Sequence, residues 1–411
     1  MKKDLLLFFA LIIAALSAHA QTDSERMNKL IAELTPLDSA YKAQYENKDY
    51  SAAIQSINQM LKLWNGMELS KEENEKYGAA IKNSVAILYY NQACSYSLVN
   101  KRKEAIDAFR QSVACGYTNY RSAKNDEDFK NIQNDKKFKK ILESIHQYDK
   151  LFILQHSKGY NKENTDSLPH FRYQSRENYS LKYTRNFFNL DSVAGNGDEI
   201  SKFKNILKFV HDTIQHDGGN FGFCESDPID IYNYHKTTGK GVNCRQLAIT
   251  LCGMYLAMGY PARYVTCLPQ DANDTDCHVI CCVYSQKLDK WLWMDPTFNA
   301  YVEDDKGNLL SIEEVRSRLI ANQPLVLNED ANWNNKKTYT KEYYLDYYMA
   351  KNLYWLECTD FNCFNPEPRF RDIKRTYIGL VPQGFTSKAT EDTMLTSDPD
   401  YFWQKPTTSK N

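Results

Sequence analysis

The stretch from residue 244 to residue 295 most constrains the fold, because its apolar pattern changes from helical to strand-like spacing. After Cys244, apolar residues step at helical spacing as far as Gly259, and Pro261 prevents the helix from continuing. Three strand-like runs follow, and the last two are joined by a polar turn. The runs are residues 263–268, 279–284 and 290–294. This order predicts an α+β fold with a helix packed on an antiparallel sheet.

Three side chains in this stretch have the chemistry of a nucleophile, a base and a base-orienting group. Cys244 begins the helix, where the helix dipole favours a thiolate. His278 begins the second strand and Asp295 ends the third. If these strands pair across the Ser285–Asp289 turn, residues whose numbers sum to about 573–575 face each other, which sets Asp295 beside His278. We therefore predict Cys244, His278 and Asp295 as catalytic residues.

These residues stand in motifs that resemble the transglutaminase-like domain, a branch of the papain-like thiol enzymes. The resemblance covers about residues 200 to 302. It implies Cys244 as nucleophile, His278 as general base and acid, and Asp295 as the orienting carboxylate. It also implies attack on amide or ester carbonyls, a thioester acyl-enzyme and no organic cofactor. The motifs are Gly241-Val-Asn-Cys-Arg, Gly259-Tyr-Pro-Ala-Arg-Tyr-Val and Trp293-Met-Asp-Pro-Thr.

An oxyanion formed at such a site needs two hydrogen-bond donors. The backbone N–H of Cys244 is expected to supply the first. The sequence leaves His216, Asn220 and Asn243 open as sources of the second.

The sequence shows no strong metal or phosphate motif. A loop with Asp271, Asn273, Asp274 and Asp276 is either a calcium ligand set or a solvated loop, and it lacks the Gly turn and distal Glu of a calcium loop. No paired C-x₂-C arrangement indicates zinc, and no Gly-rich phosphate loop is present. We therefore expect neither a metal nor a cofactor.

The first residues have the pattern of a cleavable signal peptide. A charged start, an apolar run at residues 5–16 and the small-x-small ending Ala18-His-Ala20 predict cleavage after Ala20. A membrane anchor is the alternative. No later run is long enough to span a bilayer, and a net charge of −1 does not favour nucleic acid. We expect a secreted or periplasmic protein whose partner is a peptide or protein substrate.

Export would permit disulfides among the 11 cysteines, and their odd number leaves at least one thiol free within a monomer. Cys244 is the candidate for that thiol, and Cys358 and Cys363 are close enough in sequence to bridge. The alternative is that most of the cysteines are buried free thiols.

Residues 27–150 are predicted to be helical, and two stretches, beginning at Tyr41 and Tyr89, resemble tetratricopeptide repeats. Such a module either binds a protein partner or serves as a platform for the rest of the chain. A later helix at about residues 342–350 carries tyrosines that are predicted to pack rather than to bind a ligand. The predicted organisation is a signal peptide (1–20), a helical domain (27–150), a linker (151–185), a catalytic domain (186–357) and a C-terminal extension (358–411).

Together these features predict an exported, cysteine-dependent hydrolase or acyltransferase that acts on peptide or amide bonds. Hydrolysis is favoured over cross-linking because water is always available as acceptor. The alternative is a catalytically inactive binding or assembly protein that works through its helical module.

Overall fold

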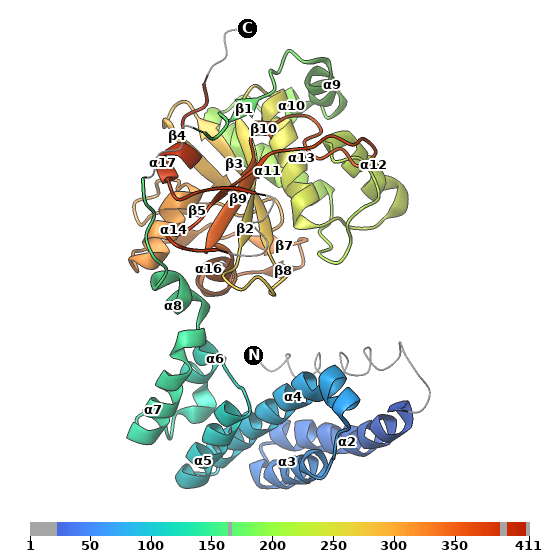
Figure 1. Cartoon of the computed structure of the whole chain (residues 1–411), viewed down its shortest axis with the longest axis vertical. Coiled ribbons are helices and arrows are strands. Elements are labelled where there is room, and N and C mark those ends of the chain that lie inside the picture. The colour runs from blue at the N-terminus through green and yellow to red at the C-terminus, as the bar shows by residue number, and fades with distance from the viewer. Residues whose placement is uncertain (1–22, 163–166, 387–392, 408–411) are drawn as a thin grey trace. The chain divides into compact units, whose positions relative to one another are not determined.

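The computed structural model describes residues 23–162, 167–386 and 393–407. The predicted signal peptide and its cleavage site lie outside the described residues. The chain divides into two compact units, Met1–Phe152 and Ile153–Asn411 (Figure 1). Among the described residues, no helix has both the length and the apolar character needed to cross a bilayer.

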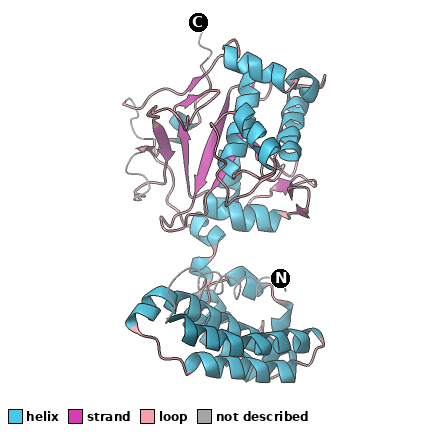
Figure 2. Ribbon diagram, turned by 90° about the vertical axis from the view of Figure 1, so that its right-hand side faces the viewer, coloured by secondary structure: helices cyan, strands magenta, loops and turns pink. Residues whose placement is uncertain are grey.

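Unit 1 is built from helices, shown in cyan in Figure 2. Neighbouring helices pack in pairs, α2 on α3, α3 on α4 and α4 on α5. One apolar core lies between α2, α3 and α4 around Trp64, and a second surrounds Phe109 of α5. The elements are α2 (Asp23–Glu46), α3 (Tyr50–Asn65), α4 (Lys71–Leu98), α5 (Arg102–Ala114), α6 (Tyr120–Lys124), η1 (Glu127–Phe129), α7 (Lys136–Ser144) and η2 (His146–Tyr148), and α8 (Lys150–Gln155) runs on into unit 2.

The packing between α4 and α5 uses small and aromatic residues as the sequence indicated. Ala93, Ala105 and Phe109 are all buried there, and Tyr96 packs against them from a half-buried position. Small side chains let two helices approach closely, and the aromatic rings fill the space between them. The helical character of this region is thus observed, and the resemblance to tetratricopeptide repeats stays a prediction.

Unit 2 is organised around a sheet that has six strands within the described residues, in the order β12-β11-β9-β2-β3-β4. All neighbours pair antiparallel except β11 and β12. Cys281 faces Met294 across the β3–β4 hairpin, so the register lies at the end of the predicted range, and His278 and Asp295 are offset by two positions instead of directly opposite. The strands are β2 (Ala262–Leu268), β3 (His278–Ser285), β4 (Lys290–Met294), β9 (Trp355–Thr359), β11 (Tyr377–Leu380) and β12 (Met394–Thr396).

Helices cover the sheet, and α13 packs directly on β2 and β3 (Figure 1). The α+β class and the helix packed on an antiparallel sheet are therefore confirmed. The helices are α9 (Tyr179–Phe187), α10 (Leu190–Ala194), α11 (Glu199–Thr213), α12 (Pro228–Thr238), α13 (Cys244–Ala257), α14 (Ile312–Ile320), α15 (Lys341–Tyr343), η3 (Tyr344–Met349), α16 (Ala350–Asn352) and α17 (Pro399–Phe402). Short strand pairs complete the unit: β1 (Arg172–Tyr173) with β10 (Phe361–Asn362), β5 (Val302–Glu303) with β6 (Val326–Leu327), and β7 (Asn332–Trp333) with β8 (Lys337–Thr338).

Two predicted boundaries differ from the structure. The boundary at 357/358 falls inside β9, and β11 and β12 beyond it belong to the central sheet. The predicted linker 151–185 contributes β1, which pairs with β10, and part of α9 to unit 2. The partner of β1 lies nearly 200 residues away, so local spacing does not reveal this pair. The strands β11 and β12 are short and lack a strong local pattern, so the sequence does not show that they join the sheet.

All 11 cysteines lie among the described residues and all are free thiols. Cys358 and Cys363 are buried and not bridged. The structure therefore agrees with the alternative of buried free thiols, in which cysteine serves mainly as a small apolar residue.

Candidate functional site

Cys244 is the first residue of α13 and is half-buried. The helix starts here because the Asn243 side chain caps it, accepting a hydrogen bond from the backbone N–H of Gln246 at 3.0 Å. As the first helical residue, Cys244 has a backbone N–H with no partner inside the helix. The sulfur and this N–H therefore sit at the positive end of the helix dipole.

His278 and Asp295 lie side by side at the end of the β3–β4 hairpin. His278 Nε2 donates to Asp295 Oδ2 at 2.7 Å, and both side chains are buried. The same carboxylate accepts the Tyr344 hydroxyl at 2.5 Å and the Thr297 backbone N–H at 2.9 Å. Since Nε2 is engaged by Asp295, Nδ1 is the ring nitrogen left for the sulfur of Cys244, with which His278 also hydrogen-bonds. The structure thus brings all three predicted residues together.

The electrostatics of the site favour a thiolate beside an imidazolium. Burial raises the pKa of Cys244, but hydrogen bonds from His216 and His278 and the charge of His278 outweigh it, and the pKa falls from 9.0 to about 6. The backbone N–H of Val279 acts in the same direction. Burial lowers the pKa of His278, but the charges and hydrogen bonds of Asp295 and Cys244 together outweigh burial, and the pKa rises from 6.5 to about 10. The charged forms therefore stabilise each other.

The structure distinguishes the three residues considered for the second oxyanion donor. Asn243 caps the helix through its acceptor Oδ1, and Asn220 Nδ2 donates to the Gly241 carbonyl at 2.6 Å and to the Tyr234 hydroxyl at 3.2 Å. His216 alone of the three hydrogen-bonds the Cys244 sulfur. Its backbone also pairs with Val242, two residues before the thiol.

The β7–β8 hairpin holds His216 in place, a support that the sequence did not reveal. Trp333 Nε1 donates to His216 Nδ1 at 2.9 Å, and the Asn334 side chain bonds both the N–H and the carbonyl of His216, at 2.8 and 2.9 Å. An indole N–H is only a donor, so Nδ1 must accept, and the proton of the neutral ring then sits on Nε2. The Trp333-Asn-Asn run is the local signal of this hairpin, but its partner lies more than a hundred residues earlier in the chain.

The tyrosines of the helix after residue 341 have separate roles. Tyr344 is buried against Asp295, whereas Tyr347 is 43% exposed. Tyr348 lies with its ring centre 5.2 Å from that of His278. The predicted packing role is therefore observed for Tyr344 but not for the exposed Tyr347.

Replacing Tyr344 with phenylalanine is expected to lower the free energy of unfolding by about 2 kcal/mol. The change leaves a buried carboxylate with one donor fewer and removes the acceptor of the Trp293 indole N–H, which now lies 3.3 Å from the hydroxyl. Urea denaturation of full-length protein measures the effect. Tyr347→Phe is the matched control, because it removes a hydroxyl from an exposed side chain. Equal stability of the two variants would show that the hydroxyl of Tyr344 is not needed to hold Asp295.

The acidic loop before His278 is bound by a lysine. Lys351 Nζ lies 3.0 Å from carboxylate oxygens of both Asp274 and Asp276, and Asp271 accepts the backbone N–H of Asn273. The ammonium group contacts the carboxylate oxygens that a calcium ion would have needed. The loop is therefore best described as a hydrogen-bonded turn fixed to α16.

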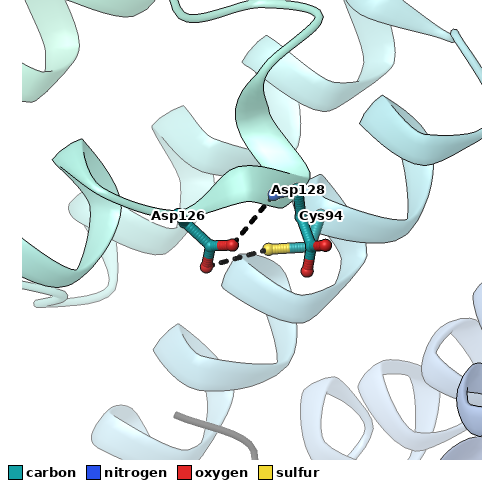
Figure 3. Close-up of side chains that lie close together, drawn as sticks. All are labelled: Cys94, Asp126 and Asp128. Atoms are coloured by element: carbon teal, nitrogen blue, oxygen red, sulfur yellow. Dashed lines mark hydrogen bonds between the residues drawn. The ribbon is translucent and has the colours of Figure 1, made fainter.

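A second polar cluster lies in unit 1, where Cys94, Asp126 and Asp128 come close together (Figure 3). The Tyr90 hydroxyl donates to Asp126 at 2.6 Å, and the Tyr45 hydroxyl donates to Asp128. Burial and the two carboxylates raise the pKa of the Cys94 thiol well above its ordinary value. Because each carboxylate accepts a tyrosine hydroxyl, we interpret the cluster as a hydrogen-bonded centre of the helical unit.

Part of unit 2 matches the model of a known protein family. Residues 188–296 match the family model of the transglutaminase-like superfamily, and this segment contains Cys244, His278 and Asp295. The resemblance read from the sequence is therefore confirmed for this segment. Searches of curated proteins and of solved structures found no match to the chain.

Proposed function

We propose that unit 2 is a cysteine-dependent hydrolase or acyltransferase that forms a thioester acyl-enzyme on Cys244. The observation that carries the proposal is the hydrogen bond from His278 Nε2 to Asp295 at 2.7 Å, together with the lowering of the Cys244 pKa by His278. A thiolate with a pKa of about 6 is ionised at neutral pH and needs no further activation.

The geometry supports a two-step acyl transfer. The Cys244 thiolate attacks the carbonyl carbon, and the C=O electron pair moves to the oxygen, which the Cys244 N–H and His216 Nε2–H stabilise. When the C=O re-forms, the bond to the leaving group breaks, and His278 gives its proton to the departing amine. Water or an amine, deprotonated by His278, then attacks the thioester and releases Cys244 as thiolate. Asp295 keeps the ring oriented throughout.

The acyl donors we propose are peptide or protein amides, and water is the acceptor we favour. Formation of the acyl-enzyme is the same for either acceptor, and only the second attack differs. The three site residues therefore do not select between water and an amine. Export of the chain, as its first residues suggest, would place such an enzyme where extracellular or periplasmic polypeptides are its substrates.

A small activated ester tests the reaction without knowledge of the natural substrate. Full-length protein is mixed with p-nitrophenyl acetate, and an acetyl group is sought on Cys244 by intact-mass and peptide mass spectrometry. The expected result is one acetyl per chain, located on Cys244, that disappears by hydrolysis. Cys252→Ala is the matched control, because that cysteine lies on the same helix and is buried. Acetylation that is absent from Cys244, or that never turns over, would contradict the proposal.

A further inference from the structure

Three phenylalanines are exposed together on unit 2, which is unusual for side chains without a polar group. Phe221, Phe223 and Phe370 are 46%, 69% and 58% exposed. The rings of Phe223 and Phe370 meet edge to face, 5.4 Å between centres. We call these three residues the Phe patch. Exposed apolar clusters of this kind are found where a protein binds a ligand or partner.

The Phe patch is attached to the helix that carries the proposed nucleophile. Gly222, between two of the phenylalanines, donates its N–H to Gln246 Oε1 at 2.8 Å and accepts from Gln246 Nε2 at 3.1 Å. Gln246 is fully buried in the first turn of α13, two residues after Cys244. This double hydrogen bond fixes the backbone beneath Phe221 and Phe223 relative to the thiol.

The segment of residues 216–223 runs from the thiol to the Phe patch. Its other end is His216, which hydrogen-bonds the Cys244 sulfur, and its middle is held by the bond from Asn220 to the Gly241 carbonyl. Phe221 is five residues from His216, so their Cα atoms are at most about 18 Å apart. An extended peptide of about five residues covers that distance.

Arg369 adds a cation to the patch. Its guanidinium carbon lies 5.0 Å from the ring centre of Phe221 and 4.3 Å from that of Phe223, and Nη1 donates to the Gly222 carbonyl at 3.1 Å. Its backbone N–H is bound by Glu225 at 2.8 Å. Among the described residues, no carboxylate forms a salt bridge with the Arg369 guanidinium group. Such a group can receive a carboxylate from a ligand.

We infer that the Phe patch and Arg369 bind an aromatic side chain of a polypeptide substrate together with a carboxylate next to it. The inference rests on the proposed function and names the substrate class for that site. The rings supply apolar and edge-to-face contact, and Arg369 supplies the charge that distinguishes an acidic neighbour from a neutral one. The patch would hold the polypeptide a few residues from the amide that Cys244 attacks.

Direct binding tests the inference without turnover. Fluorescein-labelled hexapeptides with a central Phe-Glu, Phe-Gln or Ala-Glu pair, and otherwise alanine, are titrated with full-length Cys244→Ala protein and followed by anisotropy. The Phe-Glu peptide is expected to bind at least 10-fold more tightly than either of the others. Adding Phe223→Ala and Phe370→Ala should remove that advantage, and adding Arg369→Gln should remove only the preference of Phe-Glu over Phe-Gln. Tyr179→Ala is the control, because that tyrosine is 80% exposed on α9 outside the patch. Equal binding of the three peptides, or binding that these changes do not affect, would overturn the inference.

A second measurement links the patch to the thiol. In protein with Cys244 intact, unlabelled Phe-Glu peptide should inhibit acetylation of Cys244 by p-nitrophenyl acetate. Binding without inhibition would refute a substrate role for the patch and leave the acyl-transfer proposal standing. Absence of acetylation in protein without peptide would instead refute the proposed function.

Discussion

Replacing His278 with alanine is expected to move the midpoint of Cys244 alkylation from about pH 6 toward pH 9. A thiol reacts as its thiolate, so the pH dependence of alkylation reports its pKa. Burial raises the pKa of Cys244, and His278 lowers it by both a hydrogen bond and its charge. Removing His278 leaves the effect of burial opposed mainly by the hydrogen bond from His216. If the pKa returns to 9.0, the thiolate fraction at pH 7 falls about 100-fold.

The midpoint is a better measure than the rate at one pH. A more basic thiolate is also a stronger nucleophile, which partly offsets its smaller population. Iodoacetamide labelling of Cys244 across pH 5–10, read by peptide mass spectrometry, gives the midpoint directly. His235→Ala is the matched control, because that histidine lies on α12 and bonds the Lys240 carbonyl rather than the thiol. A midpoint that stays near pH 6 in His278→Ala would show that no ion pair exists and would remove the basis for the proposed relay.

The pKa values of Cys244 and His278 set the pH range in which acyl transfer is expected. Activity should rise as Cys244 ionises near pH 6 and should persist until His278 loses its proton, since the leaving amine needs that proton. The pKa of His278 is raised by Asp295, so the decline should begin above the ordinary range of histidine.

The sequence predicted the elements around the site because their signals are local. Helical spacing after Cys244 and the polar turn at Ser285–Asp289 together determine α13 and the β3–β4 hairpin. A hairpin register follows from the turn, and this places His278 and Asp295 within reach of each other without any distant contact. The assignment of this stretch to an α+β fold required no more than these two patterns.

The parts that the sequence missed depend on pairing between distant segments. His216, Asn220 and Asn243 were equivalent candidates because nothing near them in sequence shows which side chain has a spare donor. The choice depends on Trp333 and on α13. Likewise, β1 pairs with β10, some 190 residues later. The local sequence before α9 therefore predicts a linker, because it contains no sign of this distant partner.

Replacing His216 with alanine is expected to slow acetyl transfer to Cys244 by about 100- to 1,000-fold, the usual effect of removing one oxyanion donor. The donor is preorganised: Trp333 holds the proton on Nε2, and Asn334 holds the backbone. Trp333→Phe removes the hydrogen bond to His216 Nδ1 and should slow acetyl transfer about 10-fold, the order expected when a positioning hydrogen bond is lost. His216→Gln restores a side-chain N–H and should recover part of the rate.

His216 also hydrogen-bonds the sulfur, so its two roles must be separated. At about pH 9.5 the thiol is largely ionised even if its pKa has returned to 9.0, and p-nitrophenolate leaves without a proton. A donor to the oxyanion still matters under these conditions, whereas a group that only lowers the thiol pKa does not. We therefore expect most of the loss in His216→Ala to persist at about pH 9.5, measured as the initial rate of Cys244 acetylation. If His216→Ala regains the wild-type rate there, His216 tunes the thiol alone, and the oxyanion must be stabilised by the backbone of α13 and another donor.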